Sequence, residues 1–340
     1  RTDGTMAGTR LVRALDENAG EGIAGLSATS DGQLVVAAYS SLSWDEHEVS
    51  FWQSDGTAAG TTLGRTFLIP GGAFSFPMFG QSAAGVLLWV EGETYSSSEL
   101  WLSDGSETGT ARLAVFHAIN SWTDSSGGFK VDGRSVYFIA TSDGQRSIWR
   151  SDLTPETTRP IVNVTGWYAA TRTLVVLDDR LLVLRCSDWG GTGCELWRTP
   201  KTEGAGEPFP GGCGSGPCDP IDAYNSMAEI GGRFLFLTST AQQASLWASD
   251  GSDAPATELA RLCEGDDCAS QCFQRLESAD DYIFTTSQDC EPPFDLWLSD
   301  GSPEGSFRVA RSLEALAPWL AVPGPVLAPV GAASWVFRAA

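Results

Sequence analysis

Glu99-Leu100-Trp101-Leu102-Ser103-Asp104-Gly105-Ser106-Glu107-Thr108-Gly109-Thr110 decides the fold, because related segments recur along the whole chain. Each of six copies has an apolar residue followed by tryptophan, and five of them continue with Ser-Asp two residues later. The tryptophans, which lie 49, 48, 48, 50 and 50 residues apart, are Trp52, Trp101, Trp149, Trp197, Trp247 and Trp297. A period of this length, with several short strands per unit, predicts the blades of a β-propeller.

A seventh copy of the repeat is divided between the two ends of the chain. Residues 1–12 match the second half of the motif, and residues 332–338 match the strand that precedes each motif. We therefore predict an all-β, seven-bladed propeller with four-stranded blades, forming one domain over residues 1–340. Its last blade is shared by about 1–13 and 313–340, which removes the exposed strand edges of an open ring. Because the sequence begins within a motif, we also expect a leader or a preceding segment.

Each repeat is predicted to hold four strands joined by tight turns. In residues 115–162, Asp132-Gly133 is a hairpin signal between the first two strands, and residues 135–140 and 147–150 are the second and third strands. The motif Asp is expected to accept backbone N–H bonds, while the following Gly supplies a positive φ. The third and fourth repeats have Asp152-Leu153 and Thr199-Pro200 instead, so these two turns must be built differently.

These turn and packing roles account for most of the recurring residues. We assign a structural role, rather than a ligand role, to the repeated aspartates Asp3, Asp55, Asp104, Asp250 and Asp300. The six motif tryptophans are expected to be buried in the wedge between neighbouring blades, where each contributes about 2–3 kcal/mol.

The motif resembles the bacterial repeat family named for its consensus, ELWxxDGTxxGT. The similarity is closest at Glu99–Thr110, recurs at Glu195, Asp295 and the N-terminus, and covers nearly the whole chain. The resemblance implies a propeller-like protein that is secreted or lies at the cell surface. It implies no catalytic residue and no defined ligand, because the family's motif is architectural.

The composition narrows the range of partners. The formal net charge is −22, and only Lys130 and Lys201 are lysines. Such an acidic surface repels phosphate backbones and anionic lipids, which argues against nucleic acid and membrane partners. The sequence has no apolar run of transmembrane length. We expect a secreted or extracellular surface protein, with the bacterial periplasm as the alternative location.

All eight cysteines lie between residues 186 and 290, which predicts disulfides formed in an oxidising compartment. Zinc is the alternative, but the sequence has no Cys-x-x-Cys pair and only two histidines. We predict the pairs Cys186–Cys194, Cys213–Cys218, Cys263–Cys268 and Cys272–Cys290.

Catalytic motifs are sparse. Two histidines, His47 and His117, leave little room for a Ser-His-Asp triad, and there is no Gly-x-Ser-x-Gly elbow, phosphate loop or His-Glu-x-x-His. We predict no cofactor. The acidic stretches 45–48 and 264–267 are the alternative sites for calcium, and solvated loops are the simpler interpretation of both.

Aromatic residues outside the motif gather in two loop sets that share one face of a propeller, opposite the Ser-Asp-Gly turns. These are the loops between second and third strands and the crossings between blades. The predicted ligand-binding residues are Trp44, Phe76, Trp122, Trp167, Trp189, Tyr224 and Trp319. They are candidates for stacking on sugars or anchoring a protein, and plugging the ring is the structural alternative.

Three functions are compatible with this pattern. The first is a non-enzymatic protein-binding or surface-assembly module that recognises a partner or like subunits through the disulfide-braced face. The second is a lectin that uses the loop aromatics. The third is a carboxylate-dependent hydrolase or lyase with its site at the channel mouth.

Overall fold

The computed structural model describes residues 10–14, 22–29, 32–43, 46–70, 78–91, 97–117, 129–166, 174–185, 195–209, 227–239, 242–265, 268, 271–276, 282–288, 293–313, 327–329 and 335–337. The regular structure in these ranges is antiparallel β-sheet, with short turns of 3-10 helix such as Pro155–Thr157. The described sheets are six of four strands and one of two strands. The contacts of the chain divide it into two compact units, 1–166 and 167–340.

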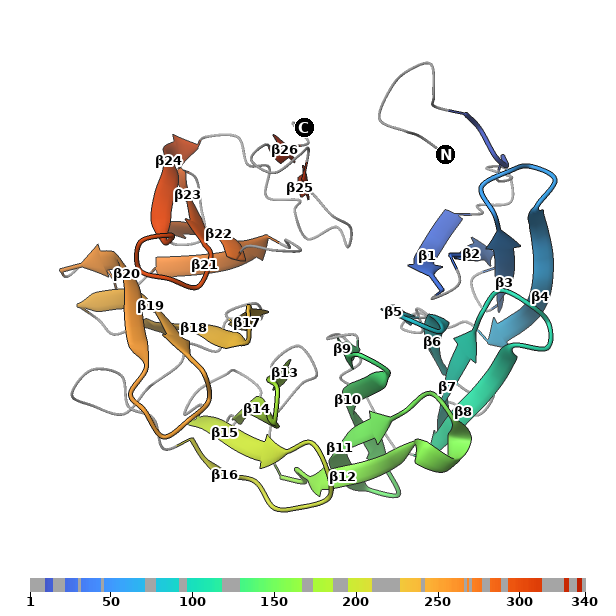
Figure 1. Cartoon of the computed structure of the whole chain (residues 1–340), viewed down its shortest axis with the longest axis horizontal. Helices are drawn as coiled ribbons and strands as arrows, with labels where there is room; N and C mark the ends of the chain where they lie inside the picture. The colour runs from blue at the N-terminus through green and yellow to red at the C-terminus, as the bar shows by residue number, and fades with distance from the viewer. Residues whose placement is uncertain are drawn as a thin grey trace. The chain divides into compact units, whose positions relative to one another are not determined.

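The first unit holds three four-stranded sheets, each ordered 1-2-3-4 along the chain (Figure 1). The first sheet has β1 (Gly22–Ala28), β2 (Leu34–Ser41), β3 (Glu46–Ser54) and β4 (Thr61–Pro70). The second has β5 (Met78–Ser82), β6 (Gly85–Glu91), β7 (Ser97–Ser103) and β8 (Thr110–His117). The third has β9 (Lys130–Asp132), β10 (Ser135–Ser142), β11 (Gln145–Ser151) and β12 (Arg159–Asn163).

The second unit repeats this order three times and ends with a two-stranded hairpin. The fourth sheet has β13 (Leu174–Val176), β14 (Arg180–Arg185), β15 (Glu195–Pro200) and β16 (Glu207–Pro208). The fifth has β17 (Met227–Ile230), β18 (Arg233–Ser239), β19 (Gln243–Ser249) and β20 (Thr257–Glu264). The sixth has β21 (Gln271–Leu276), β22 (Tyr282–Gln288), β23 (Phe294–Ser299) and β24 (Phe307–Leu313), and the hairpin pairs β25 (Leu327–Pro329) with β26 (Trp335–Phe337).

Neighbouring sheets of a unit pack face to face through alternating apolar residues of their middle strands. Between the first and second sheets, Val35, Val49 and Phe51 meet Val86 and Leu88. The same arrangement joins the second sheet to the third, the fourth to the fifth and the fifth to the sixth. Each sheet therefore buries apolar residues against its neighbour in the unit, as the blades of a propeller do.

The pairing of the third and fourth strands shifts at the motif tryptophan. The register changes between Phe51 and Trp52, and it changes at the corresponding tryptophan in the second, third, fifth and sixth sheets. Such a bulge increases the local twist of a strand and redirects its side chains. The sequence analysis did not predict this feature, because a bulge adds one residue without changing the composition of the strand.

Burial of the motif tryptophans is confirmed for three and wrong for three. Trp52, Trp247 and Trp297 are at most 9 % exposed, whereas Trp101, Trp149 and Trp197 are only half-buried. In Trp101 and Trp197 the indole N–H donates to the carboxylate two residues earlier, at 2.9 and 3.2 Å. Because that carboxylate lies at the surface, it holds one edge of the ring near solvent.

The seven-bladed ring stays a prediction. Residues 10–14 form no strand, and β26 pairs with β25 in the part of the chain that the structure describes. Within the described ranges, no helix is both long and apolar enough to cross a membrane.

Candidate binding site

The seven aromatic residues predicted to bind a ligand all lie outside the described residues. They are Trp44, Phe76, Trp122, Trp167, Trp189, Tyr224 and Trp319. Their role as a stacking or anchoring surface is therefore still a prediction. The structure does describe the strands on either side of several of them, and it defines the two ends of each sheet. We call the end that carries the Ser-Asp-Gly turn the turn end, and the opposite end the braced end.

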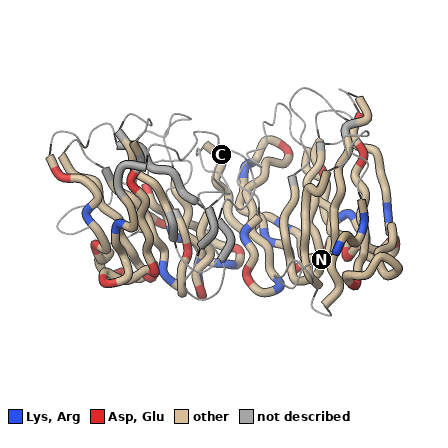
Figure 2. Tube along the Cα trace, turned by 90° about the horizontal axis from the view of Figure 1, so that it is seen from above, with Lys and Arg blue, Asp and Glu red and all other residues tan. Residues whose placement is uncertain are grey.

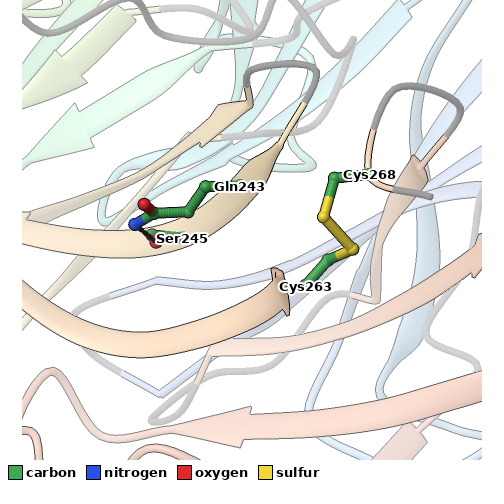
Figure 3. Close-up of a disulfide and its surroundings, with 4 residues drawn as sticks. All are labelled: Gln243, Ser245, Cys263 and Cys268. Atoms are coloured by element: carbon green, nitrogen blue, oxygen red, sulfur yellow. Dashed lines mark hydrogen bonds between the residues drawn. A yellow bond between two sulfur atoms is a disulfide. The ribbon is translucent and has the colours of Figure 1, made fainter. Parts of the chain in front are cut away.

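One predicted disulfide is present, and it lies at the braced end. Cys263 and Cys268 are bonded, with their Cα atoms 5.7 Å apart (Figure 3). Cys263 pairs in register with Ala244 at the start of β19, whereas the turn that follows β19 lies at the other end of the fifth sheet. Cys268 is fully buried. This bond confirms one of the four predicted pairs and its predicted place opposite the turn.

The other cysteines stay predictions. Cys186, Cys194, Cys213, Cys218 and Cys290, and the side chain of Cys272, lie outside the described part of the structure. The backbone of Cys272 is in β21 and pairs in register with Ser287, near the end of β22.

A polar network lies beside the disulfide at the braced end of the fifth sheet. Gln243 donates to Ser245 over 2.9 Å (Figure 3). Ser245 in turn donates to Glu258 over 2.8 Å. Arg261 also donates to Glu258, and this bond is the main cause that lowers the pKa of the Glu258 carboxyl. The network fixes the strands next to the braced loop, and its carboxylate stays ionised at neutral pH.

The regular Ser-Asp-Gly turns use their polar side chains internally. In the second sheet, Oδ1 of Asp104 accepts from the backbone N–H and the hydroxyl of Ser106, at 2.8 and 2.7 Å. Ser103 and Thr110 bond to each other across the turn at 2.6 Å, and Ser103 also accepts from the N–H of Gly105. The equivalent bonds recur around Asp55 and Asp300. The predicted backbone bonds of the motif aspartate are confirmed at Asp55, Asp104, Asp250 and Asp300, whereas Asp3 lies outside the described residues.

The two glycines of each regular turn are required for different physical reasons. Gly105 has φ +89°, which favours glycine. Gly109 has no such φ, but a Cβ at this position would overlap the carboxylate of Asp104. The same conflict exists between Gly60 and Asp55, and between Gly305 and Asp300. The second glycine of the motif is therefore there because the aspartate lies directly against its Cα.

The third-sheet turn departs from this pattern, as predicted. Asp152 accepts from Ser135 at 2.6 Å and from Arg150 at 3.0 Å, and the Ser135 bond is the main cause that lowers the pKa of Asp152. Leu153 adopts φ +67° where the first, second, fifth and sixth turns have glycine. A one-turn 3-10 helix, Pro155–Thr157, then leads into β12.

The fourth-sheet turn departs further and leaves a hollow at the turn end. Thr199-Pro200 replaces Ser-Asp, and residues 201–206 connect β15 to β16 without the compact turn. A hollow of about 740 Å³ lies between this segment and the turn of the fifth sheet. We call it the fourth-sheet hollow. It is lined by Asp179, Arg180, Arg198, Thr199, Pro200, Ala205, Glu207, Ser252, Asp253 and Ala254.

Charged groups dominate the fourth-sheet hollow. Arg198 bonds to Glu207 at 2.6 Å and to Asp253 at 2.5 Å, which joins two sheets through one guanidinium. Arg180 bonds to Asp179 and donates to the carbonyl of Gly251 at 2.8 Å. The three carboxylates are well exposed, with side-chain exposures of 66 % for Asp179, 61 % for Glu207 and 79 % for Asp253.

These contacts keep the hollow charged over a wide pH range. The bond to Asp253 is the main cause that raises the pKa of Arg198, and the bond to Asp179 does the same for Arg180. The Arg180 bond also lowers the pKa of the Asp179 carboxyl. Since a general acid or base works best with a pKa near the working pH, Arg198, Arg180 and Asp179 suit recognition of a polar surface better than proton transfer.

The sequence analysis noted the irregular fourth turn but not the hollow. The signal was the loss of Ser-Asp at a position where five other repeats keep it. What could not be inferred from sequence is that Asp253, from the next repeat, reaches Arg198. Acidic residues occur at many other places along the described chain, so charge alone does not mark the site (Figure 2).

The calcium alternatives gain no support from geometry. In the stretch 45–48, His47 is 6 % exposed and its ring lies 5.1 Å from that of Tyr39. Residues 266 and 267 of the other stretch lie outside the described residues. No group of three or more metal-ligating side chains occurs within the described ranges.

Comparison with known proteins gives structural similarity only. No family model matches the chain, and no curated protein is similar to it in sequence. A crystal structure of a Listeria monocytogenes protein matches with a TM-score of 0.52 and 8 % identity, over 86 % of this chain and 87 % of that one. The β-propeller domain of the Trilobed protease from Pyrococcus furiosus has a TM-score of 0.46 and 12 % identity, with 85 % of each chain covered. TolB from Acinetobacter baumannii has a TM-score of 0.37 and 12 % identity, with 78 % of this chain and 61 % of TolB covered. At such identities the similarity concerns the fold alone.

Proposed function

We propose that this chain is a secreted or cell-surface protein of the propeller type that binds a protein partner or like subunits and is not an enzyme. The observation that carries the proposal is the contrast between regular and irregular turns. In the regular turns the recurring polar residues are engaged in holding the backbone. Exposed and fixed charges gather instead where the repeat departs, in the fourth-sheet hollow.

The kind of chemistry in the hollow supports binding. Arg198 and Arg180 are held in place by carboxylates, so they present charge at a defined position without a large entropy cost on binding. Arginine is enriched at protein interfaces, and the rim of such an interface is polar and accessible to solvent. The braced end, with the predicted aromatics and the disulfide Cys263–Cys268, is the second candidate surface.

The same proposal includes seven blades and a closed ring. The repeat period and the four-stranded sheets that pack through equivalent faces support blades of one kind. The hairpin β25–β26 supplies two strands for a seventh sheet, and the sequence of residues 1–12 matches its fourth strand. The resemblance of the motif to the ELWxxDGT repeats is consistent with such an architecture and with a location outside the cell.

Site-specific photo-cross-linking tests the binding role with a matched control. Asp253 and Glu107 each lie three residues after a motif aspartate, but only Asp253 lines the hollow. A photoreactive residue is placed at position 253, at position 107 or at position 189, and the folded chain is irradiated with the extracellular proteins of its source. We expect protein adducts at 253 or 189 that exceed those at 107 by about tenfold.

The same cross-linking test, combined with a glycan array, also distinguishes the other two candidate functions. Specific glycan binding that falls in a Trp189→Ala or Trp44→Ala variant, without protein adducts, would favour the lectin. Release of reducing sugar from a polysaccharide would favour the hydrolase or lyase. Equal adducts at positions 253, 189 and 107 would overturn the binding proposal.

A further inference from the structure

The tripeptide Ser-Asp-Gly occurs in two kinds of turn in the described chain. Four copies are motif turns that follow a third strand, and they contain Asp55, Asp104, Asp250 and Asp300. A fifth copy, at residues 142–144, forms the hairpin between β10 and β11 at the braced end of the third sheet. Because the three residues are the same in all five copies, the copies differ in how each turn holds them.

An aspartate that precedes a glycine reacts slowly with its own main chain. The glycine nitrogen bonds to Cγ of the aspartate, and one carboxyl oxygen leaves as water with the amide hydrogen and the carboxyl proton. Water then opens the resulting cyclic imide at the main-chain carbonyl, so that the main chain runs through Cβ as isoaspartate. Glycine favours the first step because it has no Cβ to hinder its nitrogen. The reaction needs a glycine N–H that no acceptor holds and a carboxyl group that turns toward it.

The motif turns hold both of these groups. In the second sheet, the N–H of Gly105 donates to Oγ of Ser103 at 3.1 Å. Oδ1 of Asp104 accepts from the N–H and the hydroxyl of Ser106, at 2.8 and 2.7 Å. The motif serine accepts from the glycine N–H in the first, fifth and sixth sheets too, at 3.1, 3.0 and 3.2 Å. The serine of the motif therefore keeps the glycine nitrogen away from the neighbouring carboxylate.

The hairpin between β10 and β11 uses the same serine differently. Oγ of Ser142 accepts from the backbone N–H of His117 on β8 and donates to Oδ2 of Asp143, each at 3.3 Å. The second of these distances is long for a hydroxyl–carboxylate bond, so it holds the carboxylate weakly. Among the described residues, no group accepts a hydrogen bond from the N–H of Gly144. Asp143 and Gly144 are both exposed to solvent.

The backbone of Asp143 gives a second reason for reaction at this turn. Asp143 has φ +52°, a conformation that L-residues with a side chain disfavour, and its N–H donates to the carbonyl of His117 at 2.5 Å. The four motif aspartates, all within the described residues, have no positive φ. Asp132, which also precedes a glycine, has no positive φ and pairs with Ser135 in the ladder of β9 and β10. An added methylene in the main chain releases the strain at Asp143 alone.

We propose that Asp143 is a modification site at which this protein forms isoaspartate, and that the motif serine protects the four motif copies of Ser-Asp-Gly. The reaction consumes no partner molecule other than water, which it releases in the first step and takes up in the second. It lengthens the main chain at the tip of a hairpin of the braced end, one of the two candidate binding surfaces. The inference is independent of the proposed binding role, because it depends only on bonds within the first unit.

Peptide mapping of the aged full chain tests the inference. The folded chain is kept at neutral pH and raised temperature and is then digested with trypsin. The tryptic peptides 135–146 and 66–112 contain one aspartate each, Asp143 and Asp104, and electron-transfer fragmentation measures isoaspartate in both. We expect isoaspartate at Asp143 to exceed that at Asp104 by about tenfold, because the bonds of the motif turn must break before Asp104 reacts. Equal amounts at the two positions would overturn the inference.

Two controls separate the structure of the turns from their sequence. In the chain unfolded in urea, the ratio of the two rates should fall to about one, since neither turn is held there. A ratio that stays near the folded value would overturn the inference, because the neighbouring residues would then decide the rate.

The second control is a matched pair of serine variants. Ser103→Ala removes the acceptor of the Gly105 N–H and should raise isoaspartate at Asp104 by about tenfold. Ser142→Ala should change the rate at Asp143 far less, because Ser142 does not hold the Gly144 nitrogen. No rise at Asp104 in folded Ser103→Ala would overturn the protective role of the motif serine. If this variant does not fold, the comparison of folded and urea-unfolded wild type decides the question.

Discussion

The second-sheet turn and the fourth-sheet turn occupy the same position in the repeat but differ in what holds them. In the second sheet, Asp104 accepts two hydrogen bonds from Ser106, and Gly109 packs against its carboxylate. In the fourth sheet there is no aspartate at this position, and Arg198 forms ion pairs with Glu207 and with Asp253 of the next sheet. One turn is closed by short-range bonds, whereas the other leaves charged groups around a hollow.

The difference shows which turns of the repeat can change in sequence and which cannot. A regular turn needs its aspartate, its two glycines and its hydroxyls at once, because each of them fills the space or the bonding capacity that another leaves. The fourth turn has lost the aspartate, and the register shift at the tryptophan is not seen in the described pairing of β15 with β16. Binding residues can therefore change in the irregular turn without disturbing the rest of the motif.

The largest expected loss of stability is for a variant of a buried motif tryptophan, compared with a variant of a half-buried one. Trp247 is 8 % exposed and packs in the core between the fourth and fifth sheets. We expect Trp247→Ala to lower the free energy of unfolding by about 3–5 kcal/mol through the cavity it leaves. Trp197→Ala, in the irregular sheet, should cost clearly less, because its ring is partly in solvent. Urea unfolding measures both, and equal losses would break the comparison.

The second glycine of the regular turn should be the next most sensitive position. Gly109→Ala is expected to cost about 1–3 kcal/mol, because the new Cβ overlaps the Asp104 carboxylate. The control is the double variant Asp104→Ala/Gly109→Ala, in which the overlap is absent. A double-mutant cycle should show that the two losses are not additive. Additive losses would mean that the two residues do not share this space.

The disulfide of the braced end should contribute less than the core. Cys263 and Cys268 are five residues apart, so the chain-entropy estimate for their link is at most about 2 kcal/mol. We expect Cys263→Ala/Cys268→Ala to lose up to this amount. Mass mapping without reduction should find this pair together with Cys186–Cys194, Cys213–Cys218 and Cys272–Cys290. A free thiol at Cys263 or Cys268 in the untreated protein would contradict the structure.

The smallest expected effect is on the loss of stability at acid pH. The hydroxyl of Ser302 is the main cause that lowers the pKa of the Asp300 carboxyl in the folded state. A carboxyl with a lowered pKa stabilises the fold above its unfolded pKa of about 4, and this contribution is lost as the pH falls below that value. The Ser302→Ala variant should therefore lose less stability than the wild type between pH 7 and pH 3. Thr62→Ala, an exposed hydroxyl on β4, is the control.

Much of the fold could be predicted from sequence because its signals are local. The regular spacing of the tryptophans predicted the repeated sheets. The predicted strands 135–140 and 147–150 lie within β10 and β11. The aspartate and glycine roles in the turns also followed from local chemistry. The half-exposure of Trp101 and Trp197 did not, because it depends on a carboxylate two residues away that holds the indole at the surface.

The candidate site was less predictable because it depends on contacts between repeats. Arg198 and Asp253 are 55 residues apart, and neither belongs to a recognisable motif. The prediction for Trp44 and Trp189 depends only on their position in loops, so their exposure and their role remain predictions.

The proposed recognition role requires that the charges of the fourth-sheet hollow contribute little to stability, whereas the polar residues of the regular turns hold the fold. The most direct test is urea unfolding of Asp104→Ala and Asp253→Ala, each of which removes one aspartate from a turn that follows a third strand, in the second and the fifth sheet. We predict that Asp104→Ala lowers the free energy of unfolding by about 1–2 kcal/mol, since two hydrogen bonds of the turn are lost. Asp253→Ala should change it by no more than about 0.5 kcal/mol, as expected for an exposed ion pair. A loss for Asp253→Ala that equals or exceeds the loss for Asp104→Ala would contradict the account.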